Sequence, residues 1–121
     1  MIDPWDAILA LQSALGRMDA RVRELERVRG AYLADPEIMA FVDAVAAEKS
    51  IDAVEILSKR KFAPVAAARQ EVMFRAFSAG KSYSEIGRFF GVDHTTVIHG
   101  VQKIKLAHDN MSWLRKVAGR H

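Results

Sequence analysis

The chain has 121 residues and a formal net charge of +3 at pH 7, with 50% hydrophobic and 27% charged residues. This balance is typical of one folded domain with or without an appendage, and it is too apolar for a disordered protein. The complete lack of Cys excludes disulfide scaffolds, Cys-ligated zinc and thiol catalysis, and it suits a reducing cytoplasm. No apolar run approaches the ~20 residues that a membrane helix needs, so we expect a cytoplasmic protein.

Charge is distributed unevenly along the chain. Residues 1–57 contain six Lys or Arg and eleven Asp or Glu, a net of −5, whereas residues 58–121 contain twelve and four, a net of +8. A basic segment beside an acidic one indicates a module that binds a polyanion, joined to a part with another task. The alternative is a random imbalance of surface charge.

The first predicted element is one long helix over residues 5–33, with Pro4 in its first turn. Apolar residues recur along it at the spacing of a coiled-coil heptad: Leu11, Leu15, Met18, Val22 and Leu25, with Ile8 and Tyr32 as extensions. Arg29 interrupts this pattern near its end. We interpret the face as a seam for a homodimer or another partner; the alternative is an amphipathic helix folded back onto its own domain.

Three shorter segments follow, and all carry helical patterns. Asp35-Pro36-Glu37 is a helix start, because Asp35 can cap, Pro36 fits the first position and Glu37 favours the helix dipole. A break at Lys49-Ser50 precedes another helical turn or two over residues 51–57. A basic cluster, Ser58-Lys59-Arg60-Lys61, leads to a helix over residues 66–79, with Pro64 keeping the chain non-helical before it.

The last two predicted helices are joined by a short turn. Ser82 and Glu85 have the spacing of a capping box, a short helix runs to Gly91, and Asp93 caps a helix over residues 94–108 with a tail beyond. Strand-like alternation is absent throughout. We therefore predict an all-α helical bundle that contains a helix-turn-helix, with residues 1–34 as an extra long helix and residues 35–121 as the domain.

The last predicted helix has two chemically different faces. One face is apolar at helical spacing, with Val97, Val101 and Ile104. The opposite face carries Thr95, Thr96, His99 and Lys103. Thr offers a hydroxyl and a methyl group to bases, His can donate to a base or phosphate, and Lys neutralises phosphate, so this face suits a DNA major groove. In such motifs the start of the second helix, here residues 93–96, reaches the base edges.

The segment from residue 91 to 104 closely resembles the signature of the C-terminal DNA-binding domain of the bacterial replication initiator family DnaA. It contains Asp93-His94-Thr95-Thr96-Val97 with a further His two residues on. The resemblance extends over roughly residues 35–108 and includes Ser58-Lys59-Arg60, Arg69-Gln70, Ser84-Glu85-Ile86-Gly87 and Phe90-Gly91. Residues 1–34 lie outside it.

The resemblance implies a DNA-binding role for each matching residue. In that family the recognition helix reads the DnaA box through positions matched by Asp93, His94, Thr95 and Thr96, and Asp93 would accept from a cytosine amino group. His99 and Lys103 match residues beside the phosphate backbone, and Arg69 and Gln70 match a pair near the DNA. In the basic loop Lys59-Arg60-Lys61, Lys61 matches the arginine with which that family enters the minor groove. Ser84 is expected to cap or to contact phosphate.

The chain also departs from the family pattern. Two further basic positions of the loop are Ala63 and Ala67 here, and one residue is missing before Ser82 and another at Gly91-Val92. These differences predict a less cationic loop, and a weaker affinity for a DnaA box or an altered preferred site. For the basic cluster by itself, the alternative to a DNA contact is a run of solvated surface residues.

No Gly-x-x-x-x-Gly-Lys-[Ser/Thr] motif and no other catalytic constellation occurs in the sequence, so no ATPase or other enzyme and no cofactor is expected. His94 and His99 would point about 140° apart on a helix, which disfavours a metal site. A DnaA-type reader with an added helix is similar to the DNA-binding part of gene transfer agent activators of the GafA and GafY types, where a separate module contacts RNA polymerase.

The resemblance thus implies a nucleoid-associated transcriptional regulator that binds double-stranded DNA, with RNA polymerase or a second transcription-factor subunit as a candidate partner. Two alternatives stay open. In the first alternative, the chain is a replication modulator that competes at DnaA boxes. In the second, it is a protein–protein module with little DNA affinity.

Overall fold

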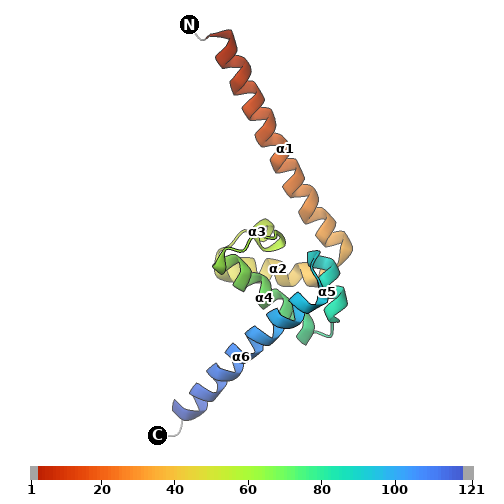
Figure 1. Cartoon of the computed structure of the whole chain (residues 1–121), viewed down its shortest axis with the longest axis vertical. Helices are drawn as coiled ribbons and strands as arrows, with labels where there is room; N and C mark the ends of the chain where they lie inside the picture. The colour runs from red at the N-terminus through yellow and green to blue at the C-terminus, as the bar shows by residue number, and fades with distance from the viewer. Residues whose placement is uncertain (1–2, 119–121) are drawn as a thin grey trace.

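The structure, a computed structural model, describes residues 3–118. These residues form helices only, which confirms the all-α prediction: α1 (Pro4–Ala34), α2 (Pro36–Lys49), α3 (Ala53–Leu57), α4 (Ala63–Ser78), α5 (Tyr83–Phe90) and α6 (His94–Ala118). Helices α2 to α5 and the first part of α6 form a compact bundle, and α1 and the rest of α6 project from it toward opposite ends of the molecule (Figure 1). Residues 119–121, the end of the predicted domain 35–121, lie outside the described residues.

Helix α1 begins where the Asp3 carboxylate accepts a hydrogen bond from the backbone N–H of Trp5, and none of its residues is buried. Near its end Val28 and Ala31 pack against the core of the bundle, and the Tyr32 hydroxyl donates to the Asp43 carboxylate. The heptad residues predicted in this helix remain exposed. The alternative of an amphipathic helix that buries this face on its own domain is therefore wrong.

Asp35 alone joins α1 to α2. Its backbone N–H donates to the carbonyl of Ala31 and closes α1, while its carboxylate accepts from the N–H groups of Glu37 and Ile38 at 3.1 Å and opens α2. Lys81, just before α5, places its Nζ 3.2 Å from the Asp35 carboxylate. Burial raises the pKa of Asp35, but the hydrogen bonds from Ile38 and Lys81 outweigh it and hold the pKa below its ordinary value.

The core is drawn from the five helices after α1. Its fully or almost fully buried side chains are Ile38, Met39, Val42, Val45, Ile56, Ala68, Val72, Met73, Ala76, Ile86, Phe90, Val97 and Val101. Phe77 lies at the apolar spacing of α4, yet it is 39% exposed because its ring stacks on Tyr83 at the surface, with centroids 4.5 Å apart. The core thus holds α4, α5 and the start of α6 together, the part that carries the helix-turn-helix.

Several helix boundaries differ from those predicted. Helix α4 begins at Ala63 rather than at residue 66, because Pro64 occupies the first turn, where no N–H is needed. Helix α3 begins only after Asp52, whose carboxylate accepts from the N–H of Val54 at 3.2 Å. Helix α6 continues past residue 108 to Ala118. Among residues 3–118, no helix combines the length and apolar character needed to cross a membrane.

Candidate nucleic-acid interface

The turn between α5 and α6 has a defined geometry that follows from three residues. Ser82 caps α5 by accepting from the N–H of Glu85 at 3.1 Å. Gly91 ends α5 with φ of 68°, a left-handed conformation that glycine adopts without strain. Asp93 then caps α6 by accepting from the N–H of Thr95 at 3.4 Å. The predicted caps are confirmed, and they fix where the recognition helix starts.

Gly87 lets this turn lie directly on α5. A Cβ at Gly87 would stand 2.8 Å from the carbonyl oxygen of Val92, closer than carbon and oxygen approach without bonding. The N–H of Val92 in turn donates to the carbonyl of Gly87 at 2.9 Å. The close approach of two backbones therefore sets the position of Asp93 and of the first turn of α6.

The inner face of α6 packs on α4. Val97 and Val101 are 0% and 2% exposed, as predicted, and Ile104 is half-buried. Gly100 faces α4 so closely that a Cβ there would lie 3.2 Å from both Gln70 Cγ and Met73 Sδ. Gln70 thus lies against the recognition helix with a half-buried side chain, rather than standing free toward solvent.

The outer face of α6 carries the predicted reading residues, and all of them are exposed: Asp93, His94, Thr95, Thr96, His99 and Lys103. The first two contact each other, with His94 Nδ1 2.9 Å from Asp93 Oδ1. This contact orients the imidazole ring and leaves its Nε2 for a base or a phosphate. Ser84 and Arg88 of α5 border a shallow hollow beside this face, together with Gly91 and Val92 of the turn.

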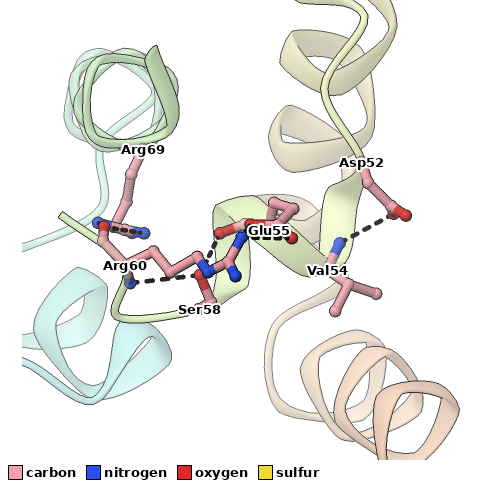
Figure 2. Close-up of polar contacts among 6 residues, drawn as sticks. All are labelled: Asp52, Val54, Glu55, Ser58, Arg60 and Arg69. Carbon is pink, nitrogen blue, oxygen red and sulfur yellow. Dashed lines mark hydrogen bonds and ion pairs between the residues drawn. The ribbon is translucent and has the colours of Figure 1, made fainter. Parts of the chain in front are cut away.

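The basic loop from Ser58 to Phe62 is held in a specific shape by hydrogen bonds (Figure 2). The Ser58 hydroxyl donates to the carbonyl of Glu55 at 2.6 Å and accepts from the N–H of Arg60 at 3.3 Å. Arg69 of α4 reaches across the loop, and its Nε donates to the carbonyl of Ile56 at 2.9 Å. Both of its terminal nitrogens donate to the carbonyl of Arg60 at 3.2 Å.

Arg69 therefore supports the basic loop from inside, a role that the sequence analysis missed. Burial lowers the pKa of its guanidinium, as expected for a charge taken partly out of water. The sequence signal was an arginine at the matched position, and this signal carries no information on whether the side chain faces the DNA or the loop. In the structure, the Arg69 guanidinium donates to two backbone carbonyls, those of Ile56 and Arg60.

The cations of the loop differ in their surroundings. Lys59 lies beside the α5–α6 turn, with its Cε 3.8 Å from the position that a Cβ would take at Gly91. Arg60 pairs with Glu55, at 3.2 Å between NH1 and Oε2, so a neighbouring carboxylate competes for its charge. Lys61 is exposed, and the next residue, Phe62, is 66% exposed, an aromatic that the sequence analysis did not single out.

The structure thus brings the basic loop and the helix-turn-helix onto one surface through the contact of Lys59 with the turn. Gln70 and Arg69 lie behind this surface, against α6 and the loop respectively. Within the described part of the chain, no group of three His, Cys, Asp or Glu side chains is arranged to hold a metal ion. An exposed polar helix face beside a cationic loop is an arrangement suited to a DNA groove and its phosphates.

Residues 38–104, more than half of the chain, match the family model described as the bacterial dnaA protein helix-turn-helix. The chain belongs to this family. The DnaA helix-turn-helix match contains α2 from residue 38 onward, α3 to α5, the basic loop and the recognition face of α6. The resemblance stated from the sequence is confirmed at this level.

Curated DnaA relatives are similar to parts of the chain. The chromosomal replication initiator protein DnaA of Caulobacter vibrioides (strain NA1000 / CB15N) is 30% identical over 137 aligned positions, which cover 94% of this chain and 28% of the relative. DnaA of Sphingopyxis alaskensis is 44% identical over 64 residues, covering 51% of this chain and 14% of the relative. DnaA of Rhodopseudomonas palustris (strain TIE-1) is 43% identical over 63 residues, covering 50% and 13%.

The chain therefore spans less than a third of the length of these DnaA relatives. The Caulobacter alignment covers 94% of the chain, so it extends into α1, beyond the part for which the sequence analysis found a resemblance. No solved structure matches the chain.

Proposed function

We propose that the chain is a transcriptional regulator that binds double-stranded DNA sequence-specifically through its DnaA-type helix-turn-helix. The observation that carries the proposal is the exposed start of α6. Asp93, His94, Thr95 and Thr96 face solvent while Gly87 and the buried side of α6 hold them in place. The proposal implies a cytoplasmic, nucleoid-associated protein that works by binding, without catalysis or a cofactor.

In this proposal the start of α6 lies in the major groove. Asp93 accepts from a cytosine amino group, and the hydroxyl and methyl groups of Thr95 and Thr96 contact base edges. His99 and Lys103, farther along the same face, contact the phosphate backbone and set the position of the helix without reading sequence. Lys59 and Lys61 neutralise phosphates at the neighbouring groove, where Lys61 matches the family's minor-groove arginine.

Transcriptional regulation is favoured by a second exposed surface on the same chain. The exposed heptad face of α1 is separate from the DNA-reading face, and a regulator that contacts the transcription machinery uses one surface for DNA and another for a protein. RNA polymerase, a second transcription-factor subunit and a second copy of the chain are the candidate occupants.

A second candidate function is replication control by competition at DnaA boxes. It is favoured by the relatives, which are chromosomal replication initiators. Displacement of full-length DnaA from a labelled box by this chain, at concentrations near its own dissociation constant, would support this candidate. Failure to displace it, alongside tight binding to other DNA, would remove it.

Fluorescence anisotropy tests the main proposal. The protein is titrated against a DnaA-box duplex and a scrambled duplex, each at two salt concentrations. We expect a preference for the box, and a log–log salt slope of about −3 if Lys59, Lys61 and Lys103 each neutralise one phosphate. No binding at either salt concentration would refute DNA binding and favour a protein–protein module.

Substitutions assign the reading face. Thr95→Ala should reduce discrimination between box and scrambled DNA by about 1–3 kcal/mol, and unchanged discrimination would show that α6 is not the reading helix. Lys103→Ala should weaken binding to both duplexes about equally and reduce the salt slope by about one. Lys105→Ala is the matched control, because helical geometry places residue 105 about 130° from the centre of the reading face.

A further inference from the structure

The projecting part of α1 carries an apolar stripe without a partner in its own bundle. Its exposed side chains are Ile8 at 46%, Leu11 at 62%, Leu15 at 53%, Met18 at 63%, Val22 at 50% and Leu25 at 63%. The stripe from residue 8 to residue 25 is about 27 Å long, at the rise of an α-helix. A continuous apolar stripe of this kind on a folded protein marks an interaction surface.

Most of this stripe lies on the side of α1 that faces away from α3, and Leu25 lies at the boundary between the two sides. The side of α1 that faces α3 carries Arg17, Ala20, Arg21 and Glu24, and these residues line a shallow groove together with Leu25 of the stripe and with Asp52 and Val54. Farther along the same side, Val28 and Ala31 pack against the core. Helical periodicity puts the centre of this side roughly 140° from the centre of the stripe. Because most of α1 projects beyond the bundle (Figure 1), a partner can cover the stripe without displacing α3.

The residues of the stripe favour a two-stranded coiled coil. The 4–3 spacing sets Ile8, Leu15 and Val22 at the a positions of a heptad, and it sets Leu11, Met18 and Leu25 at the d positions. Two of these three a residues are β-branched and two of the three d residues are leucine, and isoleucine or valine at a with leucine at d favours parallel coiled-coil dimers over larger assemblies. We propose that α1 pairs with α1 of a second copy of this chain as a parallel, in-register coiled coil.

The charges beside the stripe support the parallel orientation. Arg21 occupies a g position and Glu26 the e position of the next heptad, so in a parallel pair Arg21 of each copy faces Glu26 of the other. In an antiparallel pair, e positions face e positions and g positions face g positions. The acidic side chains at e, Asp19 and Glu26, would then face each other or the uncharged Gln12. Opposite charges meet only in the parallel arrangement, and by symmetry they meet twice.

The end of α1 limits the coiled coil. Arg29 would stand at an a position, and Tyr32 at the next d position already donates to Asp43 of its own bundle. The pairing therefore stops before the bundle, and the parallel orientation brings two bundles to the same end of the coiled coil. Resting on the proposed function, this arrangement predicts two DNA half-sites related as an inverted repeat, since half-site symmetry mirrors protein symmetry.

Sedimentation equilibrium of the full chain, from low to high micromolar concentration, tests the pairing. We expect a monomer–dimer equilibrium, and Leu15→Asp should weaken it roughly 100-fold or more, since an apolar contact is lost from both copies. Ser13→Asp is the matched control with the same added charge, because Ser13 lies on the opposite side of α1. It should leave the equilibrium unchanged. A monomeric mass for the wild-type chain at every concentration would overturn the proposal.

Two further measurements test the orientation. Arg21→Glu should weaken the dimer, and the double variant Arg21→Glu with Glu26→Arg should restore it. Because the chain has no Cys, Met18→Cys introduces a unique thiol that should form an intermolecular disulfide only where the same d position meets itself. Dimers that fail to cross-link at residue 18 would overturn the parallel orientation. Both assays omit DNA, so their failure is distinguishable from a failure of the proposed DNA binding.

Discussion

Gly87 offers the sharpest test of how the recognition helix is positioned. Replacing it with Ala adds one methyl group 2.8 Å from the carbonyl oxygen of Val92, so either α5 or the turn must move. Overpacking of this kind costs about 1–3 kcal/mol, and a clash with backbone lies at the upper end because backbone cannot rotate away. Alanine's greater helix propensity returns about 1 kcal/mol. We therefore expect a net loss of about 2 kcal/mol.

The matched control is Gly100→Ala in α6. There the added methyl group meets Gln70 Cγ and Met73 Sδ at 3.2 Å, which are parts of flexible side chains. A small adjustment of these side chains offsets the gain in helix propensity, so stability should stay within about 1 kcal/mol of wild type. The two variants make the same chemical change, and they differ in whether backbone or side chain must yield.

Thermal unfolding followed by circular dichroism measures both variants. For a domain of this size, 2 kcal/mol corresponds to roughly 10 °C in Tm, so Gly87→Ala should melt roughly 10 °C lower and Gly100→Ala within a few degrees of wild type. Gly87→Ala should also discriminate less between box and scrambled DNA, because it displaces the start of α6. A Gly87→Ala variant with wild-type Tm and wild-type discrimination would refute the backbone contact as the feature that positions the helix.

Further substitutions test the loop and the junction. Glu55→Gln should strengthen DNA binding a few-fold and steepen its salt dependence by about one, because it frees Arg60 from a competing carboxylate; anisotropy at two salt concentrations measures this. Arg69→Met should weaken binding to all duplexes, since two loop carbonyls lose their donor, and unchanged anisotropy curves would contradict a supporting role. Asp35→Ala should lower stability by about 1 kcal/mol in urea unfolding through loss of the α2 cap. Because the folded pKa of Asp35 lies below its ordinary value of about 3.9, its stabilisation is present above that value and lost as pH falls through the folded pKa; Asp35→Asn should show less of this acid-side loss.

The sequence predicted features that depend on neighbours along the chain. The caps at Ser82, Asp35 and Asp93 follow from local hydrogen bonding, and the buried and exposed faces of α6 follow from helical periodicity. The heptad pattern of α1 was equally local, and the structure removed the alternative in which that face packs on its own bundle.

Other features depend on residues that are distant in sequence, and these were missed. Arg69 turns to the carbonyls of Ile56 and Arg60, which lie 13 and 9 residues away. A family match to a DNA-contacting position could not reveal this choice. Phe77 fits the apolar spacing of α4, yet its position opposite Tyr83 leaves it at the surface. Tertiary geometry, rather than residue type, decides both cases.

The single-residue junction at Asp35 has a mechanical consequence. Asp35 ends α1, caps α2 and forms an ion pair with Lys81. The junction is therefore rigid, and α1 acts as a lever about 46 Å long. A sideways displacement of about 5 Å at its far end corresponds to a turn of only about 6° at the joint. Lys81 directly precedes Ser82, the cap of α5. A force on α1 is therefore transmitted through Asp35 and Lys81 to the start of α5, the helix before the recognition helix. In the proposed DNA complex, a partner bound at the far end of α1 is therefore expected to act on the position of α5, the helix next to the recognition helix.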